Sequence, residues 1–358
     1  MNKRETDWFR GIAALMVVLS HYGEWINILG PLEGNAETFR FAITKLGVYG
    51  VDIFFLFSGY AMIKSLGIKS LGIKSLGIKS LGIKSRGIKS RGIESRWDRE
   101  MSWQFIWKRI KNVFIPYLIV VGIIELLSGG LTSIHDFWIF IIGYNYWYMC
   151  VLFIFYIGFI VIYAMIRVKG IRVIAFSIFT YALSYVLYQH EMLPFWYVSN
   201  IAFAIGVIVG EYEKTAKKIM DKVWIPMIVL LTIGMAFITK WGLTGGVDLG
   251  GDPEDYQLWF KIGATVVWTL LILILASKCR IREKIFVFLG RNSLYIYLTH
   301  VYIFMRCIND LTCDLYMRFI ISPICIIAVS FLCNLVISGM WKLIAMLSRK
   351  LHNGTNNY

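Results

Sequence analysis

Apolar residues occur in long runs along the chain, and the short segments between these runs hold most of the charged residues. A helix of about 20 mostly apolar residues is long enough to cross the hydrocarbon core of a bilayer. The runs predict about ten such helices, at 9–29, 46–63, 104–127, 147–166, 171–188, 196–211, 223–239, 258–277, 287–306 and 316–347. The pattern is therefore typical of an all-α, polytopic membrane helix bundle.

Composition agrees with a membrane protein, and charge adds an orientation. Of the 358 residues, 58% are hydrophobic and 16% are charged, which is more apolar than one soluble core requires. The net charge of +15 would suit nucleic acid, but the basic residues lie in alternate short loops, where they mark the cytoplasmic side of a membrane. The intervening loops hold acids such as Glu33, Asp252 and Asp310. We therefore predict an integral membrane protein with both termini in the cytoplasm and without a nucleic-acid partner.

Residues 63–96 form a tandem five-residue repeat, with IKSLG four times, IKSRG twice and then an imperfect IESR. On a helix each repeat turns by about 140°, so no apolar stripe forms, and the regular glycines weaken the helix further. We predict a basic cytoplasmic loop that either has a functional role or is an expansion tolerated because long loops cost little stability. The pattern favours the tolerated expansion. The chain is thus expected to be one membrane domain, 1–358, interrupted at 63–96.

The first apolar run, RGIAALMVVLSH, begins with Arg10 and ends with His21. Eleven residues separate them, which on a helix places them within about 20° of each other and about 16 Å apart along the axis. Basic side chains at membrane depth are costly, so a shared face of this kind usually lines a cavity or a reaction path. The alternative is a topology anchor at Arg10 and an interfacial side chain at His21. Because the two basic residues share one face, the pattern favours a functional role for the pair over the topology anchor.

The second run begins with GVYGVDIFFLFSGY, in which Asp52 lies beside two phenylalanines. A carboxylate at this end of the helix would orient the imidazole of His21 and raise its basicity. The alternative is that Asp52 only starts the helix as an acidic first-turn residue. The third run, WQFIWKRIKNVFIPYL, carries Lys108, Arg109 and Lys111 at its mouth. These residues would either bind phosphate or simply mark the cytoplasmic side.

Near the end of the chain, LGRNSLYIYLTH places Ser293, Tyr297 and His300 on one face of a helix. Within a membrane such a polar stripe faces protein rather than lipid. It either forms a structural hydrogen-bond network or contributes to a substrate site. The six cysteines show no CxxC spacing and no metal-ligand pattern, so no metal is expected. A disulfide between Cys307 and Cys313, which flank the last short loop, is a further option.

These segments together resemble the integral-membrane acyltransferase-3 family. The matching motifs are RGIAALMVVLSH, GVDIFFLFSGY, KRIKNVFIPYL and LGRNSLYIYLTH, and the YWYMCVLFIFY run is similar to the aromatic start of that family's fourth span. The resemblance covers nearly the whole chain apart from the repeat, and it indicates the stand-alone form without a hydrolase-like domain. One position departs from the pattern, because Asn112 stands where members often carry a second arginine, three residues after Arg109.

Members of this family transfer acyl groups, most often the acetyl group of acetyl-CoA, to sugars of cell-surface or exported glycans. The resemblance therefore implies an O-acyltransferase of a bacterial cytoplasmic membrane. It implies acetyl-CoA as the donor substrate, a glycan or lipid-linked glycan as the acceptor, surrounding membrane lipids and no metal.

The resemblance also gives the candidate residues roles. Arg10, Lys108 and Arg109 would bind the nucleotide phosphates of acyl-CoA, the arginines with paired hydrogen bonds. The pantetheine arm has a length similar to the ~16 Å between Arg10 and His21, so the thioester would lie near the histidine. His21 would then be the general base on a sugar hydroxyl, oriented by Asp52. The stripe of Ser293, Tyr297 and His300 would belong to the acceptor site or to the structural core.

Two other classes of protein have similar features. A transporter or lipid-linked glycan flippase would also have about ten spans with buried charge, although the sequence lacks paired Gly/Pro-broken spans in two halves. A non-enzymatic sensor would use the lysine-rich repeat as a partner-binding arm. Turnover of acyl-CoA by the purified protein distinguishes an acyltransferase from these two classes. A flippase moves its substrate without CoA release, and a sensor shows neither CoA release nor flipping.

Overall fold

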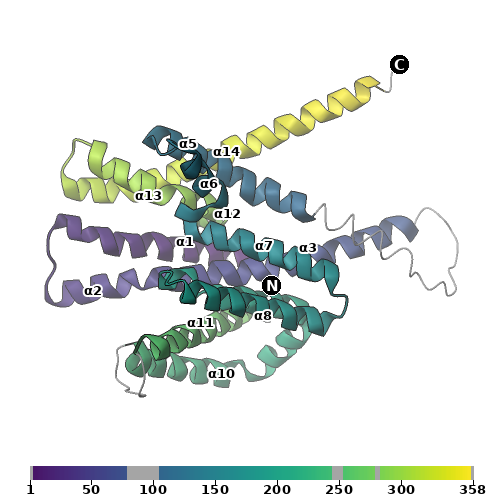
Figure 1. Cartoon of the computed structure of the whole chain (residues 1–358), viewed down its shortest axis with the longest axis horizontal. Helices are drawn as coiled ribbons and strands as arrows, with labels where there is room; N and C mark the ends of the chain where they lie inside the picture. The colour runs from purple at the N-terminus through teal and green to yellow at the C-terminus, as the bar shows by residue number, and fades with distance from the viewer. Residues whose placement is uncertain (1–2, 79–104, 244–252, 279–282, 356–358) are drawn as a thin grey trace.

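The computed structural model describes residues 3–78, 105–243, 253–278 and 283–355, which are helical and contain no strand (Figure 1). The longer helices are α1 (Lys3–Trp25), α3 (Leu46–Ile78), α5 (Ile115–Ser128), α7 (Trp147–Met165), α8 (Lys169–Gln189), α9 (Asn200–Glu211), α10 (Glu213–Phe237), α11 (Pro253–Lys278), α13 (Ser293–Asp310) and α14 (Leu315–Thr355). The shorter ones are α2 (Gly34–Thr44), α6 (Ile134–Ile142) and α12 (Lys284–Arg291). The predicted all-α architecture is confirmed.

Eight helical stretches among the described residues are long and apolar enough to cross a membrane. They correspond to eight of the ten predicted spans, from Gly34–Leu66 to Leu315–Ser348. The other two predicted spans form α1 and the pair α12–α13. These two runs carry Arg10, His21 and the polar stripe, so their candidate site residues make them less apolar than the rest. The chain is an integral membrane protein whose most polar helices hold the candidate site.

Helices α1 and α3 lie antiparallel in the middle of the bundle and approach each other through small residues (Figure 1). A Cβ atom at Gly47 would lie 2.5 Å from Oγ of Ser20, and one at Gly50 would lie 2.8 Å from the carbonyl oxygen of Ala13. Small residues are the usual means by which membrane helices come this close. The contacts set a register in which the Arg10 end of α1 faces the later turns of α3.

Glycines also bring α9 onto α3 and α12 onto α1. A Cβ atom at Gly206 of α9 would lie 2.1 Å from the carbonyl oxygen of Leu56. Where α12 crosses α1, a Cβ atom at Gly290 would lie 3.0 Å from the backbone nitrogen of Gly11 and would overlap the carbonyl of Asp7. The helices around α1 and α3 are therefore held at backbone-to-backbone distance, which leaves no room for larger side chains at the crossings.

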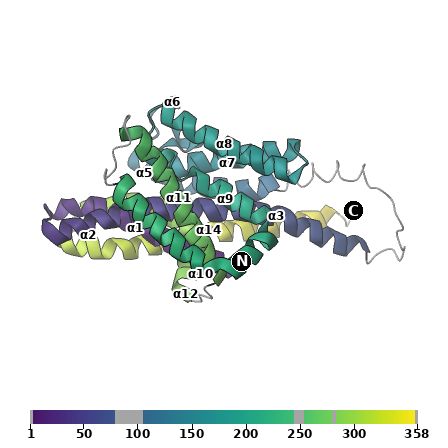
Figure 2. The same ribbon diagram turned by 90° about the horizontal axis from the view of Figure 1, so that it is seen from below.

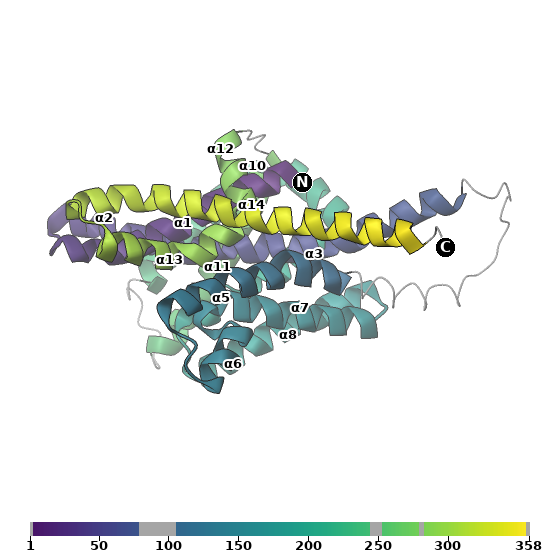
Figure 3. The ribbon, with the colours of Figure 1, turned by 90° about the horizontal axis from the view of Figure 1, so that it is seen from above.

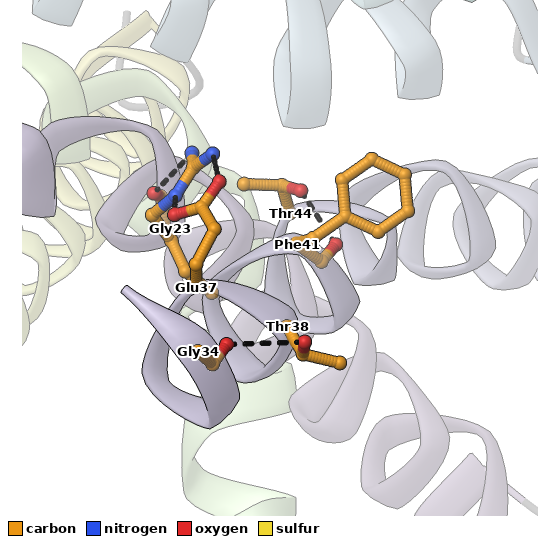
Figure 4. A network of polar contacts seen from close by, with 7 residues as sticks. Gly23, Gly34, Glu37, Thr38, Phe41 and Thr44 are labelled. Carbon is orange, nitrogen blue, oxygen red and sulfur yellow. Dashed lines mark hydrogen bonds and ion pairs between the residues drawn. The ribbon is translucent and has the colours of Figure 1, made fainter. Parts of the chain in front are cut away.

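Helix α2 is not among the predicted elements, because its sequence, GNAETFRFAIT, follows a span and is rich in polar residues. Arg40 ties it to α1, since its guanidinium donates to the carboxylate of Glu37 and to the carbonyl oxygen of Gly23 at 3.4 Å (Figure 4). Within the helix, the hydroxyl of Thr38 donates to the carbonyl oxygen of Gly34. The connection from α1 to α3 is thus structured and lies directly beside the end of α1.

The repeat departs from the prediction in its first part. The insert at 63–96 is predicted as a loop, but α3 continues as a helix through Ile78 and projects beyond its neighbours (Figure 3). A helix that has already formed extends without the cost of nucleation, so even a weak helical sequence can continue it. The loop prediction is therefore wrong for 63–78, and residues 79–96 lie outside the described part of the chain.

Two helix breaks are not predicted from the sequence. The predicted span 147–166 forms α7 without interruption, but α6 precedes it and ends at Ile142, with a C-cap at Gly143, whose φ of 81° suits glycine. The predicted span 287–306 divides at Asn292, where φ and ψ of −100° and 2° separate α12 from α13. Hydropathy does not reveal these breaks, because apolar residues continue on both sides of them.

Charge distinguishes the two ends of the bundle. Lys64 and Lys169 pair with acids at the end from which α3 projects, and Arg109 lies at the same end; we call it the basic end. Helix α2, which follows α1, lies at the opposite end, the far end, which carries Glu24 (Figure 2). The α13–α14 connection, beside Asp310, lies at this far end too (Figure 1). The described residues thus show the charge alternation found in the sequence.

The glycine crossings make a prediction about stability. Gly206→Ala should lower the midpoint of thermal unfolding in detergent micelles, because the new methyl group meets the backbone of α3 and overpacking costs about 1–3 kcal/mol. Gly234→Ala in α10 is the matched control, since no described atom outside its own stretch of helix lies within 4 Å of its Cβ position. That substitution should be neutral or stabilise by up to about 1 kcal/mol. Equal midpoints for the two variants would contradict this account of the packing.

Candidate active site

His21 lies near the far end of α1 and pairs with a carboxylate one turn away. Its Nδ1 is 3.2 Å from Oε2 of Glu24, its ring is stacked against Trp25, and its side chain is 35% exposed. A carboxylate only accepts, so Nδ1 carries the proton and Nε2 of the neutral ring is left as an acceptor. Glu24 therefore fixes the tautomer of His21, although sequence analysis assigns it no role.

His300 on α13 lies beside His21, with ring centroids 4.9 Å apart. Its Nδ1 lies 2.7 Å from the carbonyl oxygen of Tyr297, which again requires the proton on Nδ1. Its Nε2 is buried and has no hydrogen-bond partner among the described residues. An imidazole that is 3% exposed with a free acceptor nitrogen is costly unless a ligand donates to it. The two histidines thus offer unprotonated Nε2 atoms within one small region.

The rest of the polar stripe continues from His300 along α13. The ring of Tyr297 lies 5.9 Å from that of His300 and 5.2 Å from that of Tyr148 at the start of α7. Ser293, at the first residue of α13, is buried. The three residues face protein, as expected for a polar stripe within a membrane. Their roles in acceptor binding or in the core stay predictions.

Asp52 is fully buried, but the structure does not bring it to His21. Its Oδ1 accepts a hydrogen bond of 3.3 Å from the hydroxyl of Thr265 on α11. The antiparallel register aligns His21 with the first residue of α3, Leu46, so Asp52 lies six residues or about 9 Å deeper. The expected orienting contact between Asp52 and His21 is therefore not found, and Glu24 occupies that place.

Two arginines converge on α3 toward the basic end. Nη2 of Arg10 donates to the carbonyl oxygen of Phe57 at 3.3 Å, and Nη2 of Arg109 donates to that of Ala61 at 3.3 Å and to Ser65 Oγ at 3.0 Å. Their positive charges repel one another, and neither forms an ion pair within the described residues. Two neighbouring guanidinium groups without a carboxylate are suited to bind an anion with paired hydrogen bonds.

Aromatic side chains surround the second of these arginines. The guanidinium of Arg109 lies 5.0 Å from the ring centroid of Phe105 and 5.5 Å from that of Tyr156. Lys108 points to an exposed position nearby, and Lys111 lies over the ring of Trp341 at 4.5 Å. Arg109 is therefore the member of the basic cluster that reaches inward, and the lysines lie around it.

A π-helical turn at Ile110–Phe114 follows Arg109 directly and precedes Pro116. Proline cannot donate a backbone hydrogen bond and crowds the carbonyl four residues earlier, so a widened turn relieves that contact. The sequence pattern gives no sign of the π turn. Such turns often occur at functional sites, and this one includes Lys111 and joins Arg109 to α5.

The fold and these contacts define a class of protein, an integral membrane helix bundle with a pair of arginines suited to bind an anion and a pair of histidines. The profile described as an acyltransferase domain matches residues 4–339. The chain therefore belongs to the acyltransferase-3 family, and its activity is that of a membrane acyltransferase. No curated protein and no solved structure matches the chain.

The position of Glu24 generates a prediction about catalysis. Glu24→Gln should lower the rate of acyl transfer by about 10-fold to 100-fold, because the amide no longer stabilises a protonated His21, while acyl-CoA binding should be retained. Glu37→Gln is the matched control, since that acid also lies at the far end but pairs with Arg40. The measurement is CoA release by purified protein. Equal rates for the two variants would show that Glu24 has no part in the reaction.

Proposed function

We propose that this acyltransferase moves an acyl group, most readily acetyl from acetyl-CoA, onto a hydroxyl of a cell-surface or exported glycan. The observation that supports this most is the placement of Arg10 and His21 on one face of one continuous helix. Their separation of about 16 Å is similar to the length of a pantetheine arm. One acyl-CoA molecule can then contact the arginine pair with its phosphates and reach the histidine pair with its thioester.

The basic end is proposed to face the cytoplasm of a bacterium, because basic residues concentrate on the cytoplasmic side of membrane proteins. Acyl-CoA is also made in the cytoplasm. Both termini would then be cytoplasmic. Acyl-CoA enters beside Lys108. Its phosphates accept paired hydrogen bonds from Arg10 and Arg109, and their negative charge offsets the repulsion between the two guanidinium groups. The acceptor reaches the histidines from the far end. Donor and acceptor thus approach from opposite sides of the membrane and meet within the bundle.

The reaction follows from the tautomers of the two histidines. Nε2 of His21 takes the proton of the acceptor hydroxyl as the oxygen attacks the thioester carbonyl. The imidazolium that forms is stabilised by the carboxylate of Glu24 at Nδ1. Collapse of the tetrahedral intermediate breaks the carbon–sulfur bond, and the sulfur of CoA takes the proton back from His21. The ester and free CoA are the products, and His21 is neutral again.

His300 is proposed to hold the acceptor rather than to take the proton. Its Nε2 is buried and without a partner, so it can accept a hydrogen bond from a second hydroxyl of the sugar. It also lacks a carboxylate at Nδ1, where a backbone carbonyl accepts instead, and so it is the less suited of the two to carry a positive charge. The histidine pair therefore divides into a base and a positioning group.

One observation favours a transporter or flippase instead. The break between α6 and α7 at Tyr144–Tyr146 makes a discontinuous helix, a feature of transporters that move solutes across membranes. Release of CoA coupled to appearance of an acylated glycan supports the transferase. Movement of a lipid-linked glycan without CoA release would support the alternative.

His21→Gln tests the proposed base. It should lower acyl transfer by about 10²-fold to 10⁴-fold with little change in acyl-CoA affinity, because glutamine can hydrogen-bond but cannot take a proton at neutral pH. His300→Gln should act mainly on the KM for the glycan. The measurement is CoA release by the purified protein. Its acceptor substrate is unacylated glycan extracted from cells that lack the protein. If His21→Gln keeps more than about a tenth of the normal rate, base catalysis by His21 is wrong.

The arginine pair is tested by binding alone. Arg10→Ala and Arg109→Ala should each weaken acyl-CoA binding by about 10-fold or more, and Arg10→Lys should weaken it less than Arg10→Ala, since lysine keeps the charge but not the fork. Arg306→Ala is the control, because that arginine lies at the far end beside Asp310. Calorimetric titration with acetyl-CoA measures the effect. Normal affinity in both alanine variants would place the phosphates elsewhere.

A further inference from the structure

The far end carries a cavity that does not involve the histidine and arginine pairs. It lies between the last turns of α8 and the first turns of α11 that have described side chains, and its volume is about 220 Å³. Five aromatic side chains line it, namely Tyr181, Tyr185 and Tyr188 of α8, Tyr197 after η4 (Pro194–Trp196), and Trp259 of α11. No part of the proposed reaction uses these residues.

The rings form the walls of the cavity. Tyr181 and Trp259 are stacked across the two helices, with ring centroids 6.3 Å apart and an angle of 22° between the planes. Tyr188 and Tyr197 meet edge to face at 5.8 Å. Below them, the hydroxyl of Ser184 donates to the carbonyl oxygen of Tyr197 at 3.0 Å, which ties α8 to the start of α9. The aromatic walls are thus held by contacts between segments distant in sequence.

Aromatic residues at the ends of membrane helices commonly anchor a protein among lipid headgroups. An anchor of this kind needs only single rings on a convex surface, whereas here five rings line one cavity. A phospholipid headgroup also carries a phosphate, and none of the described residues that line the cavity is charged. The lining instead combines flat apolar faces with the neutral polar groups of four tyrosines, Ser184 and Gln189.

This chemistry matches a neutral sugar. A pyranose ring has an apolar face of C–H groups that packs on aromatic rings, and hydroxyls at its edge that pair with neutral donors and acceptors. Trp259 and Tyr181 are 56% and 47% exposed, so such a ring can reach them from outside. The last turns of α8, which line the cavity, lie toward the same end of the bundle as the last turns of α1, where the acceptor is proposed to enter (Figure 1).

We propose that this cleft binds a neutral sugar residue of the acceptor glycan, as a subsite separate from the hydroxyl that is acylated. The inference rests on the proposed function and deepens it, because it assigns the acceptor a second point of attachment. A glycan held at both places would lie across the far end of the bundle. Such a site selects acceptors longer than one sugar and affects their binding rather than the chemistry at His21.

The test compares two tryptophans of nearly equal exposure at the far end. The substrate is unacylated glycan extracted from cells that lack the protein. Trp259→Ala should raise the KM for this glycan about tenfold and leave kcat nearly unchanged. Tyr181→Ala should act in the same direction, and Tyr181→Phe should keep most of the affinity. Trp138→Ala in α6 is the matched control, because Trp138 is 57% exposed and does not line the cleft. Acetyl-CoA affinity, measured in the same preparations, should not change.

The outcomes separate the cleft from the proposed function. A normal glycan KM in Trp259→Ala and Tyr181→Ala, with transfer by the unaltered protein intact, overturns the cleft and leaves the proposed function in place. An equal rise in Trp138→Ala also overturns it, because the effect would then belong to membrane anchoring. Absence of transfer to the glycan by the unaltered protein would instead reject the proposed function.

Discussion

Backbone-to-backbone packing of α1 is the constraint on which the rest of the structure depends. In a bilayer the solvent around a helix is as apolar as the helix itself, so close approach through small residues takes the place of hydrophobic burial. Gly11 lets the backbone of α12 pack directly against α1, and Gly47 and Gly50 bring α3 against α1. Because α1 is enclosed in this way, Arg10 and His21 face protein rather than lipid. The free-energy cost of placing these polar side chains in a membrane is therefore reduced, because they contact other parts of the protein.

Much of this arrangement is readable in the sequence, because hydropathy reports burial in lipid and helical spacing reports shared faces. The spans, the Arg10–His21 face and the stripe that includes His300 follow from those two rules. Partner choice does not follow from them. Glu24 lies three residues after His21, a spacing that permits the observed contact, yet an acid at a helix end is equally suited to face water. Asp52 has the chemistry to orient an imidazole, but the register of two helices places it too deep.

The elements that sequence analysis misses share a physical cause. Helices α2 and α6 are short, and their formation depends on local contacts such as the reciprocal capping of Ser133 and Asp136, or on tertiary ones such as Arg40 with Gly23. Neither kind of contact changes the hydropathy of a long window. The aromatic cleft is hidden for the opposite reason, because its rings come from α8 and α11, which are far apart in the chain and adjacent only in the fold.

The convergence of Arg10 and Arg109 would couple ligand occupancy to the stability of the fold under the proposed function. The two charges repel one another in the empty protein, and donor phosphates bound by both arginines would offset that repulsion, so the free energy of unfolding would rise with donor concentration by linkage. The protein without donor would then be the less stable of its two forms. In a cell, a fall in acyl-CoA would expose the enzyme to unfolding and degradation as well as depriving it of substrate. Metabolic state would then set the amount of enzyme as well as its rate.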